Sequence, residues 1–121
     1  MGYWEQKNNP IVTKSKKFAL RIIHMYGYLI SDKKEFVLSK QVLRSGTSIG
    51  ANVREAQRGQ SLPDFYAKMN IALKEADETA YWLELLHEGK FLEDDFFTSI
   101  YEDCEELIRM LVVILKNYYR K

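Results

Sequence analysis

The stretch Val42–Gly59, VLRSGTSIGANVREAQRG, decides the fold of this chain. Its apolar and small residues recur at intervals of four and three, a spacing typical of the buried seam of an α-helix. These seam residues are Val42, Gly46, Ile49, Val53 and Ala56. A second set falls on the opposite side, basic at both ends, small in the middle and without an acid: Lys40, Arg44, Thr47, Ala51, Arg54 and Arg58. We expect this second face to contact something outside the helical core, either another subunit or a phosphate backbone.

The same periodicity continues through the rest of the chain and predicts three more helices. We expect helices over about residues 13–30 and 35–58, one from its Ser61 cap to about Glu88, and one from an Asp94 or Asp95 cap to about Tyr119. No strand pattern or internal repeat accompanies them. The chain is therefore predicted to be all-α, an up-down-up-down antiparallel four-helix bundle over residues 13–121 that follows a flexible N-terminal arm of residues 1–12.

Three glycines lie inside predicted helices. Gly46 and Gly50 stand one turn apart, beside other small residues, and small side chains let two helix backbones approach closely. Gly27 lies in the middle of the first predicted helix, where glycine costs about 1 kcal/mol relative to alanine. We expect close helix packing at all three positions.

The third predicted helix is apolar over so much of its circumference that it should be buried on more than one side. A row outside its core seam recurs at helical spacing: Ile71, Glu75, Glu78, Trp82 and Leu85. Within a single four-helix chain the three apolar members of this row have no second partner, so we predict that the row is an interface between subunits. Arg44 or Arg54 is expected to pair with Glu75 or Glu78, within one subunit or between two.

The net charge of +1 conceals an asymmetry between the two halves of the sequence. Residues 1–61 carry 11 Lys and Arg against 4 Asp and Glu, whereas residues 62–121 carry 7 against 13. Either the surface is electrostatically two-sided, or the halves neutralise each other inside the bundle or across a symmetric contact. The single cysteine excludes an internal disulfide, and no stretch has the pattern of a signal peptide or membrane span. We expect a cytoplasmic protein that does not enter membranes.

Patterns for catalysis and metal binding are weak. Glu84 and His87 form one Glu-x-x-His pair, but a di-iron bundle needs two such pairs and two further inward glutamates. The second histidine, His24, has Arg21 where the glutamate is required. Two histidines and one cysteine, Cys104, leave no credible triad. We therefore expect no enzyme activity, no cofactor and no metal.

The second and third predicted helices resemble those of a known bacterial family. The second carries Ser48-Ile49-x-x-Asn52-x-x-Glu55, preceded by Gln41 and Arg44. The third shows, in the order of that family, Phe65, Ile71-Ala72-Leu73, Lys74-Glu75-Ala76, Glu78-Thr79 and Trp82-Leu83. On these residues the chain is similar to the 23S ribosomal RNA intervening-sequence proteins over about residues 13–119, although Ala56 stands where many members have glycine.

The resemblance implies a compact four-helix bundle that assembles as a homopentamer. Members of the family are encoded within inserts in 23S rRNA genes or stand alone. The related accessory variability determinant of diversity-generating retroelements is similar to a basic pentameric barrel that binds nucleic acid and a reverse transcriptase. RNA, DNA and such an enzyme are therefore the partners that the resemblance suggests. The near-neutral net charge of this chain argues against carrying over that strongly basic role unchanged.

Two functional hypotheses follow from these patterns. In the first, the chain is a nucleic-acid-binding or ribonucleoprotein accessory protein whose cations neutralise phosphates with little reading of bases. The cations that would do so are Lys14, Lys17, Arg21, Lys40, Arg44, Arg54 and Arg58. In the second, the chain is a structural or protein-interaction scaffold without a nucleic-acid role, in which the same arginines serve assembly. For Arg44 and Arg54 taken singly, structural pairing is the favoured interpretation.

Overall fold

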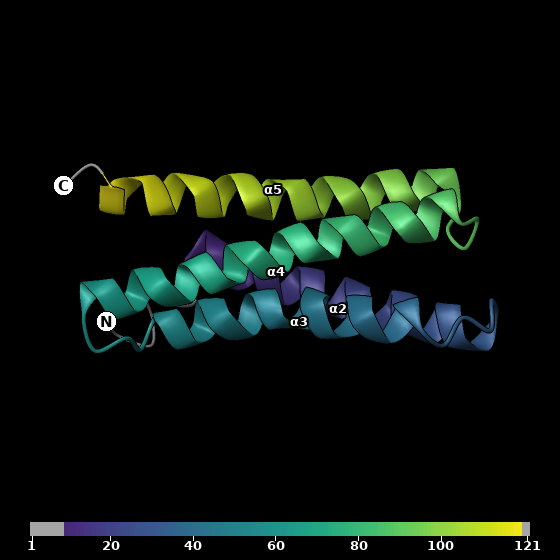
Figure 1. The fold of residues 1–121 in the computed structure, drawn as a ribbon, viewed down its shortest axis with the longest axis horizontal. Coiled ribbons are helices and arrows are strands. Elements are labelled where there is room, and N and C mark those ends of the chain that lie inside the picture. The colour runs from purple at the N-terminus through teal and green to yellow at the C-terminus, as the bar shows by residue number, and fades with distance from the viewer. Residues whose placement is uncertain (1–8, 120–121) are drawn as a thin grey trace.

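The computed structural model describes residues 9–119, the side chains of residues 118 and 119 excepted, as four α-helices without a strand. These are α2 (Pro10–Ser31), α3 (Leu38–Ala56), α4 (Leu62–Glu88) and α5 (Asp94–Tyr119). Figure 1 shows them side by side, with the chain reversing direction at each connection. The start of α2 and the end of α5 therefore lie at the same end of the molecule. The predicted all-α class is confirmed, and no helix within residues 9–119 has the length and apolarity to cross a membrane.

The first helix, α2, begins at Pro10, earlier than the predicted start at residue 13. Asn9 caps it, because its side-chain oxygen accepts a hydrogen bond from the backbone N–H of Ile11 at 3.2 Å. Proline suits the first helical position, because the backbone N–H that it lacks would have no acceptor within the helix. The prediction of an arm over residues 1–12 is therefore wrong for residues 10–12, while residues 1–8 lie outside the described part of the chain.

The second helix, α3, begins at Leu38 and not at residue 35, because Glu35 acts from outside the helix. The Glu35 carboxylate accepts hydrogen bonds from the backbone N–H groups of Val37, Leu38 and Ser39, at 2.6–3.2 Å. These N–H groups have no partner within the helix, and a negative charge beside them interacts favourably with the helix dipole. At its other end α3 stops at Ala56, before the predicted residue 58.

The predicted Ser61 cap of α4 is confirmed, whereas the start of α5 differs slightly. Ser61 caps α4 by accepting a hydrogen bond from the N–H of Asp64 at 3.2 Å. Gly89 follows the last residue of α4 and donates its N–H to the carbonyl of Leu85 at 2.8 Å. The helix α5 starts at Asp94 itself, so both predicted aspartates lie in its first turn, where their charge is favourable, and not before it.

The four helices enclose one core. The helices α2 and α4 each pack against both α3 and α5. Within α3 the predicted seam residues Val42, Ile49 and Val53 are completely buried. The seam that was read from the spacing of apolar residues therefore faces the other helices, as predicted.

Close helix approach occurs at two of the three glycines. A Cβ atom on Gly46 would lie 2.8 Å from Cγ1 of Ile22 on α2, and one on Gly50 would lie 3.3 Å from the carbonyl oxygen of Ser15. A Cβ atom on Gly27 would meet nothing within 4 Å. The close crossing predicted at Gly27 is wrong, because this residue is exposed on the outside of α2.

Candidate nucleic-acid interface

Two of the cations predicted to bind phosphate are paired with carboxylates of α5. The Nζ atom of Lys14 lies 2.7 Å from Oε2 of Glu106, and Nη1 of Arg21 lies 2.6 Å from Oδ2 of Asp103. All four side chains are 30–46% exposed, so each pair stabilises the fold by at most about 1 kcal/mol. Their main consequence is electrostatic, since part of the charge assigned to phosphate binding is neutralised within the chain.

Arg44 of α3 pairs with two carboxylates of α4 within the same chain. Its guanidinium lies 3.2 Å from Oε1 of Glu75 and donates a hydrogen bond to Glu78, and this bond raises the pKa of Arg44 above its usual value. The structure thus contains the pairing within one subunit. Glu78 also accepts a hydrogen bond from Nε1 of Trp82 at 2.9 Å. Because the Trp82 ring is half-buried against the core, the prediction that it has no second partner in one chain is wrong.

The polar residues of the family-like motif in α3 are used inside the chain. Asn52 donates a hydrogen bond from its amide to the carbonyl of Ser48 at 2.8 Å. Glu55 lies 3.2 Å from Nζ of Lys68 on α4. These contacts join one turn of α3 to the next and α3 to α4, so the motif serves packing between the two helices.

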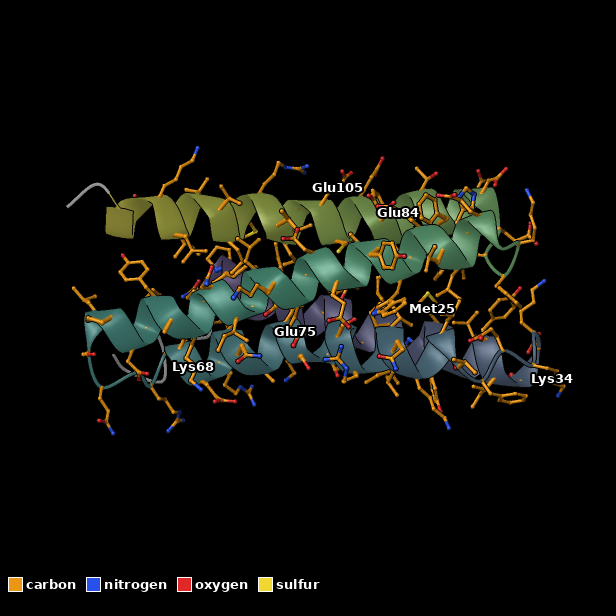
Figure 2. All side chains as sticks on the ribbon, in the orientation of Figure 1. Met25, Lys34, Lys68, Glu75, Glu84 and Glu105 are labelled. Carbon is orange, nitrogen blue, oxygen red and sulfur yellow. The ribbon has the colours of Figure 1, made fainter. Side chains whose placement is uncertain are left out.

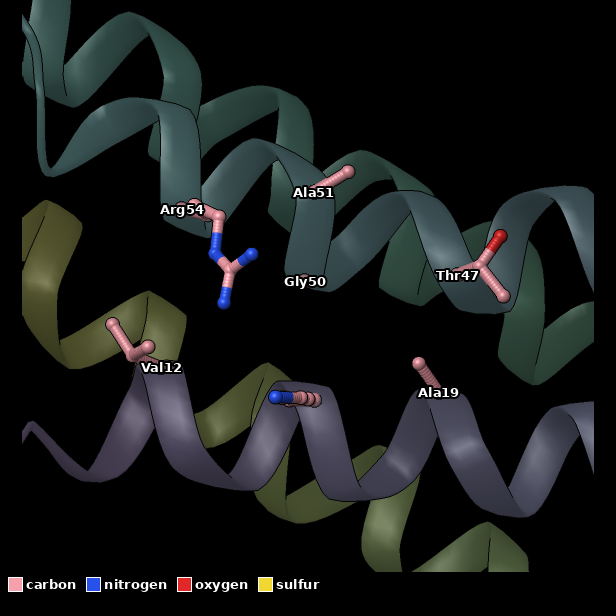
Figure 3. A pocket seen from close by; sticks show the side chains of 7 residues that line it. Val12, Ala19, Thr47, Gly50, Ala51 and Arg54 are labelled. Carbon is pink, nitrogen blue, oxygen red and sulfur yellow. The ribbon is translucent and has the colours of Figure 1, made fainter. Parts of the chain in front are cut away.

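The other four predicted cations, Lys17, Lys40, Arg54 and Arg58, have no carboxylate partner among the described residues. Arg54 contributes to a hollow between two helices, which we call the α2–α3 groove. The groove is lined by Val12, Lys16, Ala19, Thr47, Gly50, Ala51 and Arg54. Figure 3 shows the guanidinium of Arg54 extending from α3 into the space beside α2. Neither helix brings a carboxylate into the groove lining, so the lining is positively charged.

Charge is also divided along the length of the bundle. The fold brings together residues 9–17, 54–68 and 109–119, which we call the basic end. It carries Lys14, Lys16, Lys17, Arg54, Arg58, Lys68, Arg109 and Lys116 against Glu55 and Asp64, and Glu106, at its border, lies beside Lys14. The opposite end, residues 28–40 and 84–102, carries Asp32, Glu35, Glu84, Glu88, Glu93, Asp94, Asp95 and Glu102 against Lys33, Lys34, Lys40 and Lys90. Lys68 and Glu84 in Figure 2 mark these two ends along α4. The asymmetry between the halves of the sequence has become an asymmetry between two ends.

The basic end includes cations that the sequence reasoning did not assign to a site. These are Lys16, Lys68, Arg109 and Lys116, whereas the predicted Arg21, Lys40 and Arg44 lie outside the basic end. Helical periodicity identifies residues on one face of one helix, so it cannot show which helix ends meet. The predicted topology could have identified these cations. Short connections between antiparallel helices bring together the start of α2, the end of α3, the start of α4 and the end of α5.

Two further titratable side chains, Cys104 and Tyr101, have pKa values that are raised by their surroundings within the chain. Cys104 is buried, and burial raises the pKa of its thiol to about 12, so the thiolate that a nucleophile requires is absent at neutral pH. The hydroxyl of Tyr101 donates to Oε2 of Glu84 at 2.6 Å, which raises the pKa of the tyrosine to about 12. Among the described residues no group of three His, Cys, Asp or Glu side chains is arranged to hold a metal ion.

Comparison with known proteins adds the family to this geometry. Residues 7–113 match the 23S rRNA-intervening sequence protein family. The chain belongs to this family. It is also similar to a solved structure from Bacteroides thetaiotaomicron, described as a protein of unknown function from the S23 ribosomal protein family, with 52% identity and a TM-score of 0.87. That similarity covers 88% of this chain and 98% of the other. A search of curated proteins found no match. The family resemblance inferred from the motifs of α3 and α4 is therefore confirmed.

Proposed function

We propose that the chain is a non-enzymatic accessory protein that binds the phosphate backbone of RNA or DNA. In this proposal it acts as a homo-oligomer of up-down-up-down antiparallel bundles, with the five subunits that the family resemblance implies. The family takes its name from intervening sequences of 23S rRNA. Structured RNA is therefore the first ligand to test.

The basic end is the observation that carries this proposal. Six of its cations have no carboxylate partner among the described residues: Lys16, Lys17, Arg54, Arg58, Arg109 and Lys116. Cations without protein partners are free to replace the counterions that condense on a nucleic acid, and release of those counterions drives binding. Contacts of this kind fix the position of the ligand without reading its sequence. The expected activity is therefore sequence-independent and strongly weakened by salt.

A double charge reversal at the basic end tests the assignment. Lys17→Glu combined with Arg58→Glu removes two cations that make no ion pair in the fold. We expect binding of a labelled RNA hairpin at low salt to weaken by about tenfold or more, and the negative slope of log K against log salt to become shallower by about 2. Fluorescence anisotropy across a salt series measures both quantities.

The matched control is Lys33→Glu combined with Lys34→Glu, which makes the same change of net charge at the opposite end. This control should retain most of the wild-type affinity. Equal weakening by the two double variants would show that net charge, and not the basic end, governs binding. Failure of the wild-type protein to bind RNA, duplex DNA or single strands at low salt would overturn the proposed function. Native mass measured in the same buffers keeps effects on assembly separate.

A second candidate function, a protein-interaction scaffold, is favoured by exposed apolar side chains on two helices. Leu20 and Ile23 of α2 are 49% and 46% exposed, and Ile71 and Tyr81 of α4 are 39% and 53% exposed. Apolar surface of this kind marks protein interfaces where it is contiguous. Absence of nucleic-acid binding would make the scaffold the favoured function, and a reverse transcriptase the first partner to test by family resemblance.

A further inference from the structure

The α2–α3 groove has room for an apolar side chain. Small residues form its floor where α2 and α3 approach closely: Ala19, Thr47, Gly50 and Ala51. The groove encloses about 170 Å³. A cavity of about 150 Å³ holds one benzene ring, so an isoleucine or an aromatic side chain fits. Leu20 and Ile23 continue the apolar surface along α2, each about half exposed.

Two cations lie beside this apolar surface. Lys16 and Arg54 line one part of the groove, and no carboxylate lines it. The helix α2 contains no Asp or Glu at all, and the one acid of α3, Glu55, pairs with Lys68 of α4. An apolar centre with a charged rim is the usual anatomy of a protein–protein interface. The partner should therefore present apolar side chains flanked by carboxylates.

The outward face of α4 presents such a surface. Its residues recur at intervals of three and four, and we call them the α4 ridge: Ile71, Lys74, Glu78, Tyr81 and Leu85. Ile71 and Tyr81 are exposed, and Leu85 is half-buried. Carboxylates accompany the ridge, and no Lys or Arg occurs between residues 75 and 88. Glu78 and Glu84 already contact Arg44 and Tyr101 of their own chain, so Asp77 and Glu88 are the carboxylates available to a partner. Two members of the interface row predicted from sequence, Glu75 and Trp82, turn instead toward α3 and the core.

We propose that the α4 ridge of a second copy of this chain seats in the α2–α3 groove. The inference rests on the self-association in the proposed function and names the two surfaces that make it. Apolar side chains of the ridge fill the groove, and the carboxylates beside them approach Lys16 and Arg54. Each copy then offers one ridge and one groove, so the contact is heterologous, the kind that produces closed rings or open filaments.

This contact leaves the phosphate-binding surface accessible. Lys17, Arg58, Arg109 and Lys116 of the basic end do not line the groove. Arg54 does, which agrees with the sequence-based preference for structural pairing of this residue. Lys16 and Arg54 thus belong to both proposals, whereas Lys17, Arg58, Arg109 and Lys116 serve phosphate binding alone, so variants of these four test binding apart from assembly.

Complementary surface variants test the two assignments. The groove variant, Leu20→Glu with Ile23→Glu, places two carboxylates on a face without acids. The ridge variant, Ile71→Lys with Tyr81→Lys, places two cations beside the carboxylates of α4. All four positions are exposed, so both variants should fold, which circular dichroism checks. We expect each variant alone to run as the 14.3 kDa monomer by light scattering. An equimolar mixture should associate to masses above that of the monomer, because the intact ridge of the groove variant meets the intact groove of the ridge variant and the two altered surfaces carry opposite charges. A closed ring of five is not expected, since two variants cannot alternate around an odd number of contacts.

The control and the opposite outcomes are distinct. Val113→Glu changes an apolar side chain of α5 that is 61% exposed and should keep the wild-type mass. A groove or ridge variant that keeps the wild-type mass, or a mixture that stays monomeric, would overturn the assignment of surfaces while leaving self-association intact. A wild-type chain that is itself monomeric at all concentrations would overturn self-association. Loss of RNA binding in the groove variant without a change in mass would assign the groove to nucleic acid and overturn the inference.

Discussion

Alanine substitutions at two mid-helix glycines are predicted to have opposite effects on stability. Alanine is favoured over glycine inside a helix by about 0.5–1 kcal/mol. At Gly27 a new methyl group meets no atom within 4 Å, so this gain is not opposed. We expect Gly27→Ala to raise the free energy of unfolding by about 0.5–1 kcal/mol.

At Gly46 the same methyl group collides with the core. It would lie 2.8 Å from Cγ1 and 2.9 Å from Cγ2 of Ile22, a side chain with no exposed surface. Overpacking of this kind costs about 1–3 kcal/mol, which exceeds the gain in helix propensity. We expect Gly46→Ala to lower the free energy of unfolding by about 0.5–2 kcal/mol.

Urea unfolding followed by far-UV circular dichroism measures both free energies by linear extrapolation. Both variants must be compared at one protein concentration, because self-association stabilises the folded state by mass action. The predicted gap between them is at least about 1 kcal/mol. In an Ile22→Ala background, which lacks Cγ1, Cγ2 and Cδ1 of the contact, the change from Gly46 to alanine should cost less than in the wild-type background. If Gly46→Ala proved as stable as Gly27→Ala, the close approach of α2 and α3 would be refuted.

Three other tests address buried or hydrogen-bonded groups. Ser39→Ala should raise the free energy of unfolding by up to about 1 kcal/mol, because the buried Ser39 hydroxyl has no partner among the described residues. Ser45→Ala should lower it by about 1 kcal/mol, because Ser45 loses its hydrogen bond with Thr79. Equal shifts of the two variants in urea unfolding would contradict this. The thiol of Cys104 should react with a disulfide reagent at neutral pH only after unfolding, and rapid labelling of the native protein would count against its burial. The pKa of Tyr101 is raised to about 12 from 10.0, so its contribution to stability is complete below pH 10.0 and is lost as the pH rises through 12. Tyr101→Phe should therefore flatten the pH dependence of unfolding in that window, and an unchanged profile would contradict the hydrogen bond to Glu84.

The helices and their core faces were accessible from the sequence because each depends on local spacing. The seam of Val42, Ile49 and Val53 needs only the helical repeat to be recognised, and Ser61 caps α4 through a contact within one turn. The errors at helix ends have local causes of another kind. Glu35 caps α3 from outside the helix, but a glutamate would also suit the first turn of the longer helix predicted from residue 35. Asn9 caps α2 at Pro10, but an asparagine and a proline would also suit the loop before the shorter helix predicted from residue 13.

The candidate site was less accessible, because it depends on which side chains of different helices meet. Lys14 and Arg21 were assigned to a phosphate-binding edge, yet carboxylates of α5 lie beside both. Helix periodicity says which way a cation points from its own helix but not what the neighbouring helix places opposite it. Arg109 of α5 was missed for the same reason. It belongs to the basic end because of neighbours on other helices that are distant in the sequence.

The salt dependence of RNA binding by the wild-type protein tests the central claim most directly. A labelled RNA hairpin is titrated with protein from low to moderate salt, and the native mass of the protein is measured in each buffer. The proposed function predicts binding by an intact oligomer, with log K falling against log salt at a slope of about −4 or steeper, since each phosphate contact contributes about −0.9. No binding at low salt, or binding that does not change with salt, would contradict a role for the basic end in holding phosphates.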